Sequence, residues 1–190
     1  YGIISTSINL ASVLGTITTL GLGTAVSKLI PEYLARKQIK KVNYLIRFSL
    51  KVVISLNLAI VFIFFLFSPD LSLLLKLPED AVILTGALIF IFVISGLFGW
   101  IIYGFQEMKK FLVTDTIGQI TKVAIAATLI FLGFRYLGPL IGIAISFLVI
   151  AIARFLFINF KGEVEKVPSK EIFLDYAFPA FTATIAWIFF

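Results

Sequence analysis

The sequence predicts an all-α, polytopic integral membrane protein, a bundle of helices with no soluble domain. Three observations predict this class. Hydrophobic residues make up 61% of the 190 residues and charged residues only 14%, against about 25% charged in ordinary soluble domains. The apolar residues form six long runs with few charges. Lysine and arginine concentrate in every second gap between these runs.

Six membrane-spanning helices are expected, because each complete run approaches the about 20 apolar residues that cross a ~30 Å hydrocarbon core. The last run is cut off by the end of the chain. Runs this uniformly apolar lack the alternation of barrel strands. The expected helices cover about 3–29, 43–68, 80–105, 112–134, 137–160 and 172 onward.

The first expected helix carries a row of polar side chains at intervals of three or four residues, which places them on one helix face. The members of this polar row are Ser5, Asn9, Ser12, Thr16 and Thr19. Such a face avoids lipid. It either packs against neighbouring helices, where hydroxyl residues are common, or lines a wet cavity. In the second case Asn9, Ser12 and Thr16 are candidate substrate-binding residues.

The segment 31–47 follows this helix, which Pro31 is expected to close. It mixes apolar residues such as Tyr33 and Leu45 with five basic residues. This pattern suits a helix lying among the lipid headgroups. A solvated loop that retains basic residues on one side of the membrane is the alternative.

The second and third expected helices have ordinary boundaries. Ser68-Pro69-Asp70 is expected to end the second. Glu79 and Asp80 precede the third and place acidic groups at the positive end of its dipole. Trp100 and Tyr103 lie near its other end, as interfacial anchors do.

The fourth expected helix contains Asp115, Gln119 and Lys122, whose spacing places them on one face. An ionisable residue inside a membrane span is costly and indicates a functional site by default. Lys122 lies about two turns deeper than Asp115. It either faces a cavity, with Gln119, or extends its stem toward the headgroups.

The fifth expected helix opens at Gly138-Pro139, and the sixth contains Pro179, which permits a bend. Four basic residues lie near the predicted cytoplasmic ends of the first, second and fifth helices, namely Lys28, Arg47, Lys51 and Arg154. They are either topology anchors or part of a basic ring at the mouth of a cavity, where they would attract a phosphate or pyrophosphate.

The basic residues also predict the topology. Fourteen of the 16 lysine and arginine residues fall in or beside the first, third and fifth gaps. Because basic residues near helix ends are retained on the cytoplasmic side, the loops near 31–47, 104–112 and 159–171 are predicted to be cytoplasmic. The Tyr1 end is then outside, and the chain is expected to be an internal fragment of a longer protein.

Several chemistries are excluded by composition. The sequence has no cysteine and no histidine, which removes disulfides, imidazole bases and the commonest zinc ligands. No acidic cluster suits a metal or a glycosyl-transfer site. We therefore expect no cofactor, no metal and no enzymatic activity. The net charge of +6 is explained by topology and anionic lipids, so no nucleic-acid partner is expected.

The order of several segments resembles the polysaccharide biosynthesis flippases of the multidrug/oligosaccharidyl-lipid/polysaccharide (MOP) exporter superfamily. The resemblance extends over the whole chain, and its motifs are loose and not catalytic. They are Leu20–Lys28, Tyr33–Lys37, Tyr103–Lys110, Leu137–Ala144 and Asp175–Phe181.

This resemblance implies a MATE/MOP-like protein of two helical lobes in the cell membrane. Residues 1–171 would form most of the first lobe, lacking its first span, and residues 172–190 would begin the second. Such proteins move lipid-linked oligosaccharides across the cytoplasmic membrane by alternating access. The partner would be a polyprenyl-(pyro)phosphate-linked glycan, together with glycan assembly enzymes. Lys28, Lys122 and Arg154 could supply a basic cavity.

Two other functions stay open. A cation-coupled multidrug or metabolite antiporter of the same superfamily would need cavity carboxylates, and Asp115 is the ion-coupling candidate. A membrane enzyme of polysaccharide assembly would need a large external loop with catalytic acids or histidines. The external gaps are short, and the sequence has no histidine.

Overall fold

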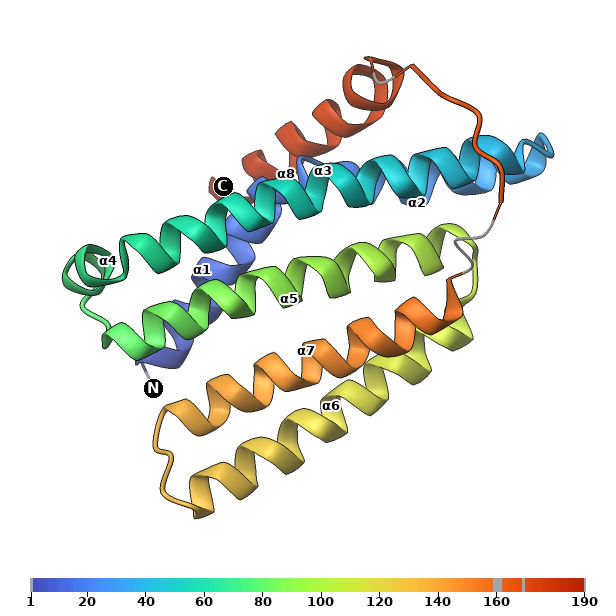
Figure 1. The fold of residues 1–190 in the computed structure, drawn as a ribbon. Coiled ribbons are helices and arrows are strands. Elements are labelled where there is room, and N and C mark those ends of the chain that lie inside the picture. Colours follow the sequence, from blue (N-terminus) through green and yellow to red (C-terminus); the bar gives the residue numbers. More distant parts are fainter. Residues whose placement is uncertain (1, 159–161, 169, 190) are drawn as a thin grey trace.

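The computed structural model describes residues 2–158, 162–168 and 170–189, and within these ranges the protein is helical (Figure 1). Tyr1 and Lys161, on which the predicted topology also draws, lie outside the described residues. In chain order the elements are α1 (Gly2–Thr19), α2 (Leu22–Ala35), α3 (Ile39–Leu66), α4 (Ser68–Leu75), α5 (Glu79–Gly104), α6 (Met108–Phe131), α7 (Leu137–Phe157), the π-helix η1 (Glu171–Ala177) and α8 (Phe178–Phe189).

The long helices lie side by side and alternate in direction, with α5 at the centre (Figure 1). α5 packs against α1, α2, α3, α6 and α7, and its core side chains include Leu88, Ile89 and Leu97. One end of the bundle holds the α2–α3 turn, the α5–α6 turn and the segment after α7 (Figure 1). The opposite end holds the start of α1, α4 and the α6–α7 connection. Three lysine-rich and arginine-rich gaps therefore meet at one end, as the charge alternation predicts.

Four helices in the described residues are long and apolar enough to cross a membrane, namely α1, α3, α5 and α7. α6 also runs along the bundle beside α7 (Figure 1). Its composition is more polar because its middle carries Asp115, Gln119 and Lys122. The all-helical membrane bundle that the sequence predicts is confirmed.

The expected first helix, 3–29, is wrong, because the chain breaks at Leu20 and Gly21. Both residues have left-handed backbone conformations, with φ of 46° and 72°. A Cβ at Gly21 would overlap the backbone oxygen of Ala177. The break therefore follows from close contact with the η1–α8 junction, which a single straight helix could not make.

Pro31 does not close the helix, and the segment 31–47 does not form an interfacial helix. α2 continues through Pro31 to Ala35, and α3 starts at Ile39 after a turn at Lys37, where φ is 58°. The reason is burial: Tyr33 and Leu45, expected to face headgroups, lie in the bundle core at 4% and 0% exposure. Tertiary packing thus overrides the cost of a proline within the helix.

The remaining helix boundaries differ from the expected ones at α4 and after α7. Ser68-Pro69-Asp70 begins the short helix α4 rather than only ending the second span, since a proline is well tolerated in the first turn of a helix. The last helix starts as the π-helix η1 and becomes α-helical at Phe178, next to Pro179. Proline lacks the N–H that an α-helical bond would require there, which agrees with the expected irregularity.

We predict that Gly21→Ala lowers the thermal stability of the protein in detergent. A non-glycine residue in a left-handed conformation costs about 1–2 kcal/mol, and the new methyl group must also displace the Ala177 backbone. Gly96→Ala is the matched control, because nothing lies within 4 Å of its added Cβ. Its melting temperature should be unchanged or slightly raised. Equal melting temperatures for the two variants would contradict this account of the break.

Candidate functional site: polar pockets along α1

A pocket of about 160 Å³ lies where α1, α5, α6 and α7 meet, and it contains three of the predicted site residues. Ser12 comes from α1, and Gln119 and Lys122 come from α6. The Lys122 ammonium donates a hydrogen bond to Gln119 Oε1. Lys122 is the only charged residue of the lining, so the pocket is positive. We call it the Lys122 pocket.

Two further pockets continue along the same side of α1 toward α2. One, of about 200 Å³, lies between α1 and α5 and includes Thr16, Thr19 and Trp100. The other, of about 140 Å³, shares these three residues and reaches Thr24 and Thr184. Together with the Lys122 pocket they follow successive turns of α1, and we call the three pockets the α1 furrow.

Ser12, Thr16 and Thr19 of the polar row line these pockets, whereas Ser5 and the predicted binding residue Asn9 line none of the three. Asn9 and Ser12 are exposed, and Thr16 is half-buried. The packed face is a different one, formed by Ser7, Ala11, Gly15 and Thr18. On that face Thr85 Oγ1 donates a hydrogen bond to Ser7 Oγ at 2.8 Å. The polar row and the packed face of α1 are thus different faces, and the C-terminal part of the row, Ser12 to Thr19, is the part that lines pockets.

A groove of about 380 Å³ between α6 and α7 meets the Lys122 pocket, with Lys122 and Ile143 lining both. Lys122 apart, its lining is aliphatic: Val123, Ala126, Ala127, Ile130, Pro139 and Ile143. α7 approaches closely here, because a Cβ at Gly142 would lie 2.9 Å from the Cβ of Ala126. The ammonium therefore lies between the Lys122 pocket, which adds Ser12, Gln119 and Ser146 to a largely apolar lining, and an aliphatic groove, the α6–α7 groove.

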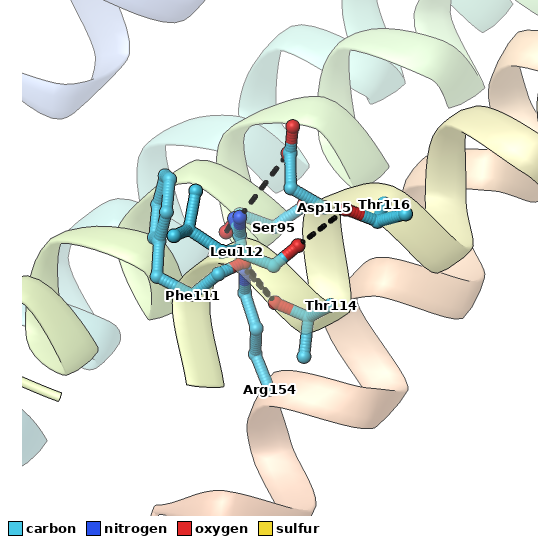
Figure 2. Close-up of polar contacts among 7 residues, drawn as sticks. All are labelled: Ser95, Phe111, Leu112, Thr114, Asp115, Thr116 and Arg154. Atoms are coloured by element: carbon cyan, nitrogen blue, oxygen red, sulfur yellow. Dashed lines mark hydrogen bonds and ion pairs between the residues drawn. The ribbon is translucent and has the colours of Figure 1, made fainter. Parts of the chain in front are cut away.

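Arg154 does not line the α1 furrow. It is 4% exposed and lies between helices, as Figure 2 shows. Its NH1 donates to the Ser95 carbonyl at 2.9 Å and its Nε to Thr114 Oγ1 at 3.2 Å. The guanidinium carbon also lies 4.5 Å from the centre of the Phe111 ring. These contacts join α7 to α5 and α6, so the structure gives Arg154 a role in helix packing.

Asp115 faces Arg154 and not a second acid. Its Oδ1 lies 3.4 Å from Arg154 NH2, and its side chain is 45% exposed (Figure 2). Among the described residues no group of three acidic or other ligating side chains could hold a metal ion. The antiporter alternative would pair Asp115 with another acid, whereas the structure pairs it with Arg154.

Lys28 also lies apart from the Lys122 pocket. It is exposed on α2, and its ammonium lies 5.0 Å from the centre of the Tyr176 ring of η1, within the range of a cation–π interaction. Arg47 donates to the carbonyl of Gly162 at 3.2 Å. Of the three residues expected to supply a basic cavity, only Lys122 lines the Lys122 pocket and the α6–α7 groove.

Comparison with solved structures places this bundle in a known class of membrane fold. A multidrug resistance MATE family transporter of the MOP superfamily, solved in an inward-facing conformation, matches with a TM-score of 0.69 at 18% identity. The match covers 95% of this chain and 46% of the transporter, so the chain spans about half the length of that neighbour.

The family follows from the sequence match. Residues 1–190 match the family of polysaccharide biosynthesis proteins, and the chain belongs to that family. A search of curated proteins finds no match. The resemblance inferred from the order of segments is confirmed.

Sequence reasoning missed two contributors to the α1 furrow. Trp100 looks like an interfacial anchor from its position near a helix end, and Ser146 of α7 carries no distinguishing pattern. The signal that could have identified Trp100 is Gly23, because a Cβ at Gly23 would lie 2.5 Å from the Trp100 ring. The glycine is visible in the sequence, but its partner 77 positions away is identified only by the structure.

We predict that Arg154→Met destabilises the protein by about 2–3 kcal/mol, because it removes several hydrogen bonds and leaves the Thr114 hydroxyl short of a partner. Asp115→Asn should cost much less, since the carboxylate is nearly half exposed. Unfolding free energies in mixed micelles give both values. Arg36→Gln, which breaks the exposed pair with Glu32, is the control and should cost below about 1 kcal/mol. Equal losses for Arg154 and Arg36 would refute the packing role.

Proposed function

We propose that the protein is part of a membrane transporter that moves a lipid-linked oligosaccharide or polysaccharide precursor across the cytoplasmic membrane. Family membership and the MATE-type fold support transport in a polysaccharide pathway. The observation that carries the lipid-linked substrate is the position of Lys122. Its ammonium lies between a pocket that also contains Ser12, Gln119 and Ser146 and a groove that is otherwise aliphatic.

This position suits an amphiphile whose phosphate joins a sugar to a hydrocarbon chain. An ammonium group with three donors binds phosphate oxygens by charge-assisted hydrogen bonds. The Gln119 side chain beside it carries two further N–H donors. The α6–α7 groove offers an aliphatic surface to the first part of the hydrocarbon chain, and the α1 furrow offers the hydroxyls of Ser12, Thr16 and Thr19 to the head.

The direction of the site also supports this assignment. The α1 furrow extends from Lys122 toward the end of the bundle where the basic gaps meet, which the positive-inside rule assigns to the cytoplasm. The α6–α7 groove extends toward the opposite end, where α6 and α7 are joined (Figure 1). A lipid loaded from the inner leaflet has this orientation, with its head toward the cytoplasm. Alternating access would then re-expose the head on the outer side.

The cation-coupled antiporter is less well supported, because Asp115 is paired with Arg154 and the Lys122 pocket is positive. A positive pocket disfavours the cationic compounds that carboxylate-lined cavities attract. Glycan assembly enzymes are proposed as partners on the general ground that a translocated glycan must be made and then used.

We predict that Lys122→Gln in the full-length protein lowers translocation of the lipid-linked glycan by about 10- to 100-fold, the value of one charge-assisted hydrogen bond. Lys122→Arg should retain much of the activity, because it keeps the charge. Translocation is measured in proteoliposomes by the accessibility of the glycan to a soluble lectin.

Lys109→Gln is the matched control, since Lys109 is an exposed lysine of the same helix outside the pocket. It should transport normally. If Lys122→Gln and Lys109→Gln both transport like the wild type, the phosphate role of Lys122 is wrong.

A further inference from the structure

Beyond the phosphate contact, we propose that Trp100 and the threonines of the α1 furrow form a carbohydrate subsite, in which a sugar ring of the substrate stacks on the indole. This inference rests on the proposed function and assigns a second part of the same substrate. It concerns the two pockets between α1, α2, α5 and α8, which contain no charged residue in their linings.

The first observation is the placement of Trp100. Its side chain is 43% exposed and lines both pockets. One edge of the ring rests against Gly23, where any side chain would collide with it, and Tyr103 packs against it in an edge-to-face arrangement with centroids 6.1 Å apart. The indole is thus held in place while part of it remains accessible. A positioned aromatic face is the surface on which the C–H groups of a sugar ring pack.

The second observation is the hydrogen-bond polarity of the threonines. Thr16 Oγ1 donates to the Ser12 carbonyl and Thr19 Oγ1 to the Thr16 carbonyl, both at 2.9 Å. Thr184 Oγ1 donates to the Ala180 carbonyl at 2.8 Å. Each hydroxyl has one proton, and that proton is engaged by the helix backbone. What these residues offer to the furrow is oxygen lone pairs, so they accept hydrogen bonds and do not donate them.

This polarity selects the class of ligand. A phosphate oxygen is an acceptor and gains nothing from acceptor hydroxyls, whereas a sugar hydroxyl can donate to them. The α1 furrow therefore has two chemically distinct parts. The Lys122 pocket supplies donors for an anion. The other two pockets, here called the threonine pockets, supply the acceptor hydroxyls of Thr16, Thr19 and Thr184 and an aromatic surface for a neutral polyol. Ser12 and Thr16 are one helical turn apart, about 6 Å along the axis, so the two parts are adjacent.

The order of the two parts agrees with a glycan attached to phosphate. Sugar rings follow the phosphate directly in such a molecule, and the threonine pockets follow the Lys122 pocket along α1. Gly15, Gly21 and Gly23 line this path, and their missing side chains keep it open.

The test measures binding of two lipids to the full-length protein in nanodiscs of neutral lipid. One is the lipid-linked oligosaccharide extracted from the membranes of the source organism. The other is a sugar-free polyprenyl pyrophosphate of the same chain length. We expect Trp100→Ala to weaken binding of the glycan-bearing lipid by about 3- to 10-fold. Its affinity for the sugar-free lipid should be unchanged.

Conservative variants separate recognition from misfolding. Trp100→Phe keeps an aromatic ring and should recover part of the affinity. Thr16→Val and Thr19→Val keep the side-chain volume and remove the hydroxyl acceptor. Each should weaken only the binding of the glycan-bearing lipid, by about 2- to 10-fold. Thr128→Val is the matched control. Thr128 is an exposed threonine of α6 that also donates to its own helix, at 2.8 Å from the Ala124 carbonyl, and it lies outside the α1 furrow.

The outcomes distinguish this inference from the proposed function. The carbohydrate subsite is overturned, while the proposed function stands, if Trp100→Ala weakens the binding of both lipids equally or of neither. It is also overturned if Thr16→Val binds both lipids like Thr128→Val. If the wild-type protein binds neither lipid, both proposals fail. A loss confined to the glycan-bearing lipid, with partial recovery in Trp100→Phe, supports the subsite.

Discussion

The structure depends on one constraint, which is that polar groups in a membrane bundle need a partner within the protein or contact with water. Most threonines of the long helices meet it by donating to a carbonyl three or four residues earlier, as Thr18, Thr85 and Thr121 do. Arg154 meets it by lying between three helices and using the Ser95 carbonyl and the Thr114 hydroxyl. Ser12, Thr16 and Thr19 of the polar row of α1 are not packed against a neighbouring helix and line pockets instead.

This constraint explains why similar residues have different roles. Lys122 and Arg154 are both basic residues within long helices, and sequence position alone gives them equal standing. Burial separates them. Arg154 is almost fully enclosed and its donors contact protein atoms, which makes it a link between α5, α6 and α7. Lys122 is only partly buried, contacts Gln119 of its own helix, and lines both the Lys122 pocket and the aliphatic α6–α7 groove. Only the second arrangement leaves a charge accessible to a ligand.

The sequence predicts most of the fold because hydropathy and charge act over single helices. Run lengths give the long helices, and the spacing of Asp115, Gln119 and Lys122 gives their common face. The break at Gly21 is not predictable in the same way, because it depends on contact with Ala177, far away in the sequence. The same holds for Tyr33, which looks interfacial in sequence and is buried by tertiary packing. For the site, the polar row of α1 is visible in the sequence, but whether it packs or lines a cavity depends on which neighbouring face α5 occupies.

The hydroxyl chemistry of α1 gives the polar row a more specific meaning than polarity alone. The hydroxyl proton of a helical threonine can bond either a backbone carbonyl of its own helix or a ligand. The carbonyl of the preceding turn lies within hydrogen-bond distance in every helix. Thr16 and Thr19 take that bond, so their remaining capacity is to accept. These hydroxyls can accept hydrogen bonds but are unsuited to anions. The Lys122 pocket, about one turn away beside Ser12 of α1, contains the ammonium that is suited to them. Because the two environments lie next to each other along one helix, their combination matches a molecule that is itself divided, with an anionic group beside a donor-rich neutral one.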